Sequence, residues 1–144
     1  MRAGDTLTAM SQNGQQPLPL IMMRELADNL ATPLFLVDRD GVLVYYNEAA
    51  EGILGLRYAD AGSLTADEWG ERWGALHPDG SPMSADERPI ACAMRQGKPC
   101  HMPMLLITTE GVRRSIEVTA FPLLARADEI VGGVAIFWDS SGVV

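Results

Sequence analysis

The segment LVDRDGVLVYYNEAAEGILG constrains the fold more than any other part of the chain. Two β-prone runs, at residues 34–37 and 42–46, flank Asp38-Arg39-Asp40-Gly41, where a glycine can adopt the positive φ of a tight turn. Asn47 follows directly, and its side chain can accept a hydrogen bond from a free amide in the first turn of a helix that stops at Gly55. The segment therefore predicts a β-hairpin that runs straight into a short, capped helix.

Helical patterns lie on both sides of this segment. Apolar residues recur every four positions in residues 17–30, which predicts an amphipathic helix with a broad stripe formed by Leu18, Met22, Leu26 and Leu30. Thr65–Glu68 and Ser84–Glu87 resemble capping sequences and predict further short helices. The helix that follows the second sequence ends at Gly97 and should place inward Ile90, Ala93 and Met94.

The C-terminal third changes to strand patterns, which predict three long strands at residues 102–109, 112–124 and 130–138. In the second strand, Ile116, Val118 and Ala120 alternate with mostly polar residues, which predicts one buried face. The last strand is apolar on both faces from residue 133 to 138, which predicts burial on both sides.

Composition fits one compact domain, because 47% of the 144 residues are apolar and 21% are charged. The net charge of −8 disfavours nucleic acid as a partner. No apolar run approaches the roughly 18 to 20 residues that cross a bilayer, and no signal peptide is evident, so we expect a cytoplasmic protein without a membrane partner. Residues 1–17 are polar and unpatterned and predict a disordered tail, whereas residues 141–144 should begin a C-terminal linker.

Together these segments resemble a PAS domain of the bacterial sensory type. The resemblance rests on the hairpin segment quoted above, on HPDGSPMSADERPIACAMRQGKP, and on the closing IVGGVAIFWDSS, although Asp139-Ser140-Ser141 replaces the usual Asp-x-Thr and Asp128-Glu129 stands where Asp-Gly is common. It implies an α+β PAS fold over residues 18–140. Such a fold has a five-stranded antiparallel sheet of order 2-1-5-4-3, helices and a cavity on one face, and an N-terminal flanking helix.

The resemblance also implies a function in signal transduction, including transcription regulation. A sensory PAS domain would bind a small apolar or amphipathic ligand in its cavity and relay a conformational signal to an output domain such as a kinase or phosphatase. The alternative is a ligand-free interaction or dimerisation module. The inward positions expected to bind the ligand are Leu36, Ile53, Leu54, Trp73, Ile90, Met94, Met104, Leu106, Ile116, Val118 and Ile136.

No cofactor, metal or catalytic site is expected. Cys92 lies in IACAMRQ rather than in the Asn-Cys-Arg-Phe-Leu-Gln motif of flavin photosensors, and the helix around it lacks the axial His of haem sensors, so we expect a colourless domain. Cys100 and His101 supply too few ligands for a closed zinc site, and the two cysteines are expected to be free thiols. No nucleophile, base and phosphate-loop arrangement points to an enzyme.

The first helix has a broad apolar stripe, and PAS relatives commonly use this helix to join two chains. We therefore predict a homodimer, with Leu18, Met22 and Leu26 at the interface. The chain stops at Val144, soon after the last strand, so we expect a fragment or a truncated regulator.

Several residues have two readings from sequence alone. Trp69 and Trp73 fit either core packing or a cavity wall. Arg113 and Arg114 could be exposed hairpin residues or could meet a ligand carboxylate. The same choice between core and cavity applies to Met83, Met94, Met102 and Met104.

Overall fold

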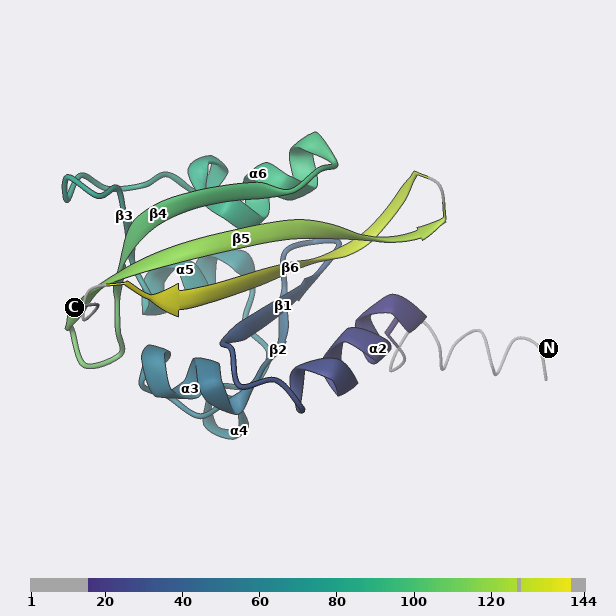
Figure 1. Cartoon of the computed structure of the whole chain (residues 1–144), viewed down its shortest axis with the longest axis horizontal. Coiled ribbons are helices and arrows are strands. Elements are labelled where there is room, and N and C mark those ends of the chain that lie inside the picture. Colours follow the sequence, from purple (N-terminus) through teal and green to yellow (C-terminus); the bar gives the residue numbers. More distant parts are fainter. Residues whose placement is uncertain (1–15, 127, 141–144) are drawn as a thin grey trace.

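The computed structural model describes residues 16–126 and 128–140, and the centre of this part of the chain is an antiparallel sheet (Figure 1). The sheet has the order β2-β1-β6-β5-β4-β3. Its strands are β1 (Leu34–Asp38), β2 (Leu43–Tyr46), β3 (Ala75–Leu76), β4 (Cys100–Ile107), β5 (Arg113–Arg126) and β6 (Glu129–Asp139). The helices are α2 (Leu18–Ala27), α3 (Glu48–Leu54), α4 (Tyr58–Ala61), α5 (Ala66–Arg72) and α6 (Pro89–Gln96), with a 3₁₀ turn at η1 (Ala85–Glu87). Residues 1–15 of the predicted tail, which extends to residue 17, and the predicted linker at 141–144 lie outside the described residues.

The predicted fold is confirmed, with one strand added. The five predicted strands are present in the predicted spatial order, and the two-residue β3 extends the sheet by pairing Ala75 with Leu106 and Leu76 with Leu105. A strand of two residues is too short to show an alternating pattern, which is why the sequence did not indicate it. The long β5–β6 hairpin runs the length of the molecule (Figure 1).

The opening hairpin forms as its turn chemistry predicts. The Asp38 carboxylate accepts hydrogen bonds from the amides of Asp40 at 2.8 Å and Val42 at 3.1 Å, and Gly41 has a φ of +83°. Asn47 caps α3 by accepting a hydrogen bond from the Ala50 amide at 3.0 Å. The hairpin and the cap fix the position of α3 relative to β1.

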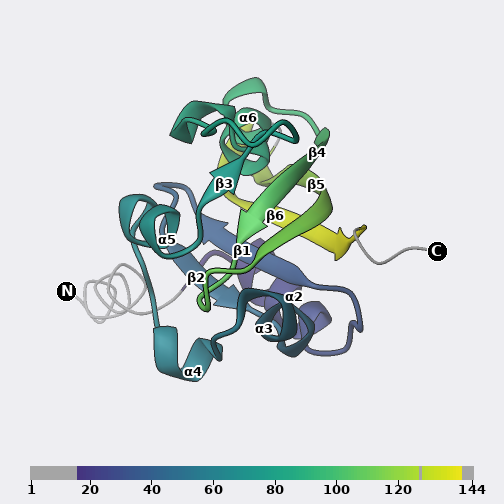
Figure 2. The same ribbon diagram turned by 90° about the vertical axis from the view of Figure 1, so that its left-hand side faces the viewer.

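Apolar residues on the two faces of the sheet form separate cores. One core lies between the sheet and the helices α3, α5 and α6, and the other lies between the sheet and α2. The views agree that α6 lies beside β4 and β5, with α3 and α4 toward the β1–β2 end (Figure 2). Strand alternation divides the residues, so Phe35 and Val37 of β1 join the first core, whereas Leu34 and Leu36 join the second.

Helix α2 covers the outer face of the sheet with a different side from the predicted stripe. Leu20 and Ala27 are buried against the sheet, with exposed fractions of 2% and 0%. Gly132 makes room for this contact, because a Cβ there would lie 3.0 Å from a Leu20 methyl group. Three of the four residues of the predicted stripe face away from the sheet, with exposed fractions of 65% for Leu18, 60% for Met22 and 50% for Leu26. The fourth, Leu30, lies beyond the end of α2 and packs against the second core.

Strand β6 is fully buried on both faces in its central part. Residues 131–134 are buried between α2 and the helical layer, and the last two of them belong to the stretch for which the two-sided apolar pattern predicts burial. Trp138 is 41% exposed, so the prediction is wrong for the end of the strand. Near the end of the strand, Phe137 is still buried in the core on the helical side, whereas Trp138 lies at the surface.

Candidate functional site

A cavity of about 80 Å³ lies between the inner face of the sheet and helices α5 and α6. Its floor comes from alternating residues of β1, β4, β5 and β6, and its walls come from the helical segments. The lining consists of Phe35, Leu54, Trp69, Trp73, Ala75, Arg88, Pro89, Ile90, Met104, Leu106, Ile116, Val118, Ala135 and Phe137.

Most of the predicted ligand-binding positions converge on this cavity. Those in its lining are Leu54, Trp73, Ile90, Met104, Leu106, Ile116 and Val118. Ile53 and Met94 belong to the same core but not to the lining. The prediction is wrong for Leu36 and Ile136, because both lie in the second core, against the face of the sheet that α2 covers. Their strands are apolar on both sides, so the sequence did not show which side faces the helices.

Sequence reasoning missed several lining residues. Phe35 and Phe137 are the neighbours of Leu36 and Ile136, and the correct face assignment would have identified both, together with Ala135. No sequence pattern identifies Arg88 as a lining residue, because a charged residue before a proline is expected at the surface.

Two tryptophans form a fixed wall of the cavity. The Trp69 indole donates a hydrogen bond to the Gly41 carbonyl at 2.9 Å, and the Trp73 indole donates to the Thr109 hydroxyl at 2.9 Å. The Phe35 ring meets both indoles edge to face, with ring centroids 5.2 Å from Trp69 and 6.3 Å from Trp73. Because their N–H groups are satisfied outside the cavity, both indoles present apolar surface to it.

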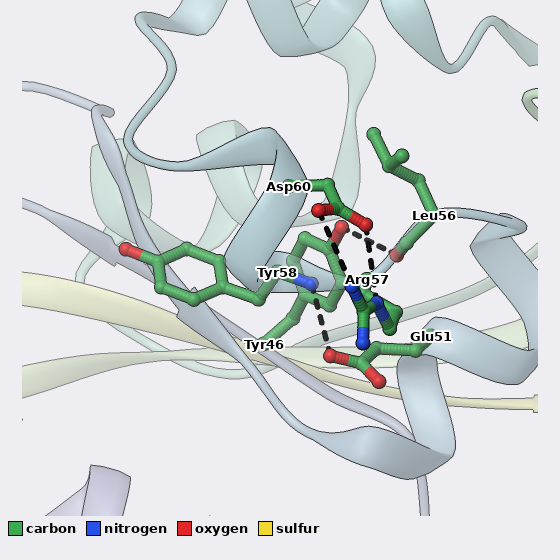
Figure 3. A network of polar contacts seen from close by, with 6 residues as sticks. All are labelled: Tyr46, Glu51, Leu56, Arg57, Tyr58 and Asp60. Atoms are coloured by element: carbon green, nitrogen blue, oxygen red, sulfur yellow. Dashed lines mark hydrogen bonds and ion pairs between the residues drawn. The ribbon is translucent and has the colours of Figure 1, made fainter.

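Polar contacts hold the corner between α3 and α4, next to the cavity wall (Figure 3). The Tyr46 hydroxyl donates to the Leu56 carbonyl at 2.6 Å, and the Tyr58 amide donates to Glu51 at 2.9 Å. The Tyr46 ring packs edge-on against Trp73 with centroids 5.6 Å apart. Burial raises the pKa of Tyr46 above its ordinary value, and the charge of Glu51 adds to this shift.

Arg88 is the charged residue in the lining. It precedes α6, and its guanidinium carbon lies 5.0 Å from the centre of the Trp69 ring. Its Nε atom is buried and has no hydrogen-bond partner among the described residues. Burial lowers the pKa of Arg88, and the charge of Asp67 acts in the opposite direction.

Other polar candidates are engaged with the protein itself. Arg114 binds Asp139 through Nε at 2.9 Å, so it is not available as the predicted alternative partner of a ligand carboxylate. His101 is exposed on β4 and lies 3.0 Å from Glu117. Burial raises the pKa of the Cys100 thiol, and the neighbouring Cys92 thiol contributes. Within residues 16–126 and 128–140, no cluster of three potential metal ligands occurs, and no helix has the length and hydropathy of a membrane span.

The fold and the cavity define an α+β module that encloses a site between one face of an antiparallel sheet and a layer of short helices. A family model described as the PAS fold matches residues 27–143. The chain belongs to this family, and PAS domains are sensory and signalling modules.

Solved structures of low sequence identity share the fold. A PAS domain from Colwellia psychrerythraea is 16% identical with a TM-score of 0.62, and the match covers 86% of this chain and 98% of that one. A PAS domain from the fruit-fly ELK potassium channel is 13% identical with a TM-score of 0.65, covering 85% and 97%. A LOV protein from Rhodobacter sphaeroides is 12% identical with a TM-score of 0.66, covering 86% and 68%. Comparison with curated protein sequences finds no match.

Proposed function

We propose that this PAS domain is a non-catalytic sensor that binds a small apolar or amphipathic molecule between the sheet and helices α5 and α6. The observation that supports this function is the cavity of about 80 Å³, with a lining that is apolar apart from Arg88. Burying apolar ligand surface there would supply the affinity, at roughly 25 cal/mol per Å².

The size of the cavity favours a small ligand. Typical pockets for drug-sized molecules measure about 300 to 1,000 Å³, several times the volume found here. A flavin or haem would require the helices to move apart, so the proposal includes neither cofactor. The flexible side chain of Met104 offers some room for adjustment.

The ligand would act by shifting the population between two arrangements of the helices on the sheet. Helix α6, which contributes lining residues, packs on β5 and β6, and β6 leads to the C-terminal end of the domain. We propose that an output domain such as a kinase or phosphatase reads this shift.

Extraction of the purified domain with organic solvent, followed by mass spectrometry, tests the proposal. One small molecule per chain, absent after Ile90→Trp fills the cavity, is the expected result. A control variant, Leu124→Trp, changes an exposed position on β5 and should retain the molecule. Failure to find a ligand, together with an unchanged melting temperature in a screen of small apolar compounds, would contradict the sensor function.

A ligand-free dimerisation module is the second candidate. The observation that favours it is the exposed stripe of Leu18, Met22 and Leu26 on α2, which faces away from the chain's own sheet. This function predicts a dimer whose affinity is the same with the cavity open or filled by Ile90→Trp.

A further inference from the structure

Arg88 has a buried side-chain N–H group that no described residue satisfies with a hydrogen bond. Hydrogen bonding normally satisfies a buried N–H, and leaving one unpaired costs free energy comparable to a lost hydrogen bond. The Nε of Arg88 is shut off from solvent and has no acceptor among the described residues. The rest of the cavity lining consists of apolar side chains, so the lining offers this N–H no side-chain acceptor.

The surrounding residues hold the guanidinium in place without neutralising it. The Trp69 ring lies on one side at 5.0 Å. Gly70 lies next to it on α5, and a Cβ at that position would approach the two terminal guanidinium nitrogens to 2.5 and 2.6 Å. The absence of a side chain at Gly70 therefore leaves the space that the guanidinium fills.

No carboxylate of the described residues pairs with Arg88. The ion pairs found in this part of the chain join other residues, and Asp67 influences Arg88 only through its charge. Guanidinium groups bind carboxylates through two parallel hydrogen bonds, which makes a ligand carboxylate the natural partner. Trp69 and Arg88 are both half-buried, which places them toward the outer side of an otherwise mostly buried lining.

We propose that the cavity ligand is a monocarboxylate, with its apolar body against the sheet and its carboxylate on Arg88. This inference rests on the proposed sensor function and specifies the ligand class. The net charge of −8 opposes nonspecific anion binding, so a preference for an acid would have to arise at Arg88 itself.

Titrations of the whole chain with straight-chain carboxylates from butyrate to octanoate, each compared with its primary amide, test the inference by NMR. An acid and its amide have nearly the same shape but differ in charge. We expect at least one acid to bind about tenfold to a hundredfold more tightly than its amide, with the largest shift at the Arg88 Nε–H signal.

Two variants should abolish this preference by different routes. Arg88→Met removes the charge, and the Arg88 side chain makes no cap hydrogen bond to α6 whose loss would disturb the helix. Gly70→Ala leaves the arginine in the sequence but displaces its guanidinium, so it tests the geometry if Arg88→Met folds poorly. Arg95→Met is the matched control, because Arg95 is exposed on the same helix and outside the lining.

The outcomes separate the two hypotheses. If amides bind as tightly as acids, or if Arg88→Met preserves the preference, the carboxylate inference is overturned and the sensor function stands. If no acid binds, the carboxylate inference is again overturned, while extraction of the purified domain still decides the sensor function. An extracted ligand without an acidic group would have the same consequence.

Discussion

Asn47 joins three segments of the chain through one buried side chain. Its Oδ1 accepts hydrogen bonds from the amides of Leu34 and Ala50, both at 3.0 Å, and its Nδ2 donates to the carbonyls of Ala27 at 3.0 Å and Thr32 at 2.9 Å. The sequence predicted only a bond to an amide in the first turn of α3, which Ala50 supplies, because a local helix cap is visible as a pattern. The other partners belong to the end of α2 and the start of β1, which only the folded chain brings near.

Asn47→Ala should therefore destabilise the domain by about 2 to 4 kcal/mol, since it removes a cap and leaves buried backbone groups unpaired. Urea denaturation measures this loss. Asn29→Ala is the control, because the Asn29 side chain makes an exposed bond to the Glu25 carbonyl. A loss below about 1 kcal/mol for Asn47→Ala would show that water replaces the missing partners.

The raised pKa of Tyr45 predicts that the free energy of unfolding depends on pH in the alkaline range. Burial, followed by the hydrogen bond to Asp28, raises the pKa of Tyr45 to about 12. Because the folded pKa lies above the unfolded value of about 10, this contribution to stability is complete below pH 10 and is lost between pH 10 and 12. Ultraviolet titration should show delayed phenolate formation in the folded domain. Tyr45→Phe should remove that part of the delay, and a titration unchanged by the substitution would contradict the assignment.

Among the elements, α5 and β6 contain glycines with opposite expected responses to alanine. At Gly70, the atoms that a Cβ would meet belong to the flexible end of Arg88, so Gly70→Ala should keep or raise stability by up to about 1 kcal/mol. At Gly132, a Cβ would lie 2.5 Å from the Val37 carbonyl, which belongs to a paired strand. Gly132→Ala should cost about 1 to 3 kcal/mol. Thermal denaturation of the two variants measures the contrast, and equal losses would contradict it.

The elements were more predictable than the faces they present. The hairpin, the capping boxes at Thr65 and Ser84 and the three long strands follow local rules, and they form within a few residues of their predicted bounds. The capping sequence at Ser84 begins a 3₁₀ turn rather than the helix itself, because Pro89 starts α6 afresh.

Face assignment failed where both sides of an element are apolar. In β1 and β6 the pattern does not alternate in polarity, so Leu36 and Ile136 were placed on the wrong side. In α2, the spacing of four selected the exposed stripe, while Leu20 and Ala27 make the contact with the sheet. Which face is inward depends on partners distant in sequence, and periodicity alone does not encode them.

At the scale of the whole molecule, the exposed stripe of α2 predicts a symmetric homodimer. Replacing both Met22 and Leu26 by Glu would place charges in an apolar interface at a cost of several kcal/mol. Both side chains are at least half exposed in the single chain, so the double variant should remain folded and become monomeric. Light scattering measures the mass. Leu20→Glu is the contrasting variant, since it places a charge in the chain's own core and should unfold it.

A monomer of the unmodified chain at tens of micromolar would contradict the dimer outright. Loss of folding in the double variant would instead show that the stripe supports the chain's own core, against the exposure found for Met22 and Leu26.

The ion pair between Arg114 and Asp139 joins the end of β6 to the start of β5. The Ser140 amide also donates to the Ser115 carbonyl at 2.8 Å, and Asp139 pairs across the ladder with Ile116, whose side chain lines the cavity. A residue of the cavity floor and the last residue of β6 thus form one cross-strand pair. A helix of twenty residues attached there would be about 30 Å long, so a turn of about ten degrees at its base would carry its far end through about 5 Å. A small rotation at the edge of the cavity would thus displace the far end of such a helix by about the length of one helical turn.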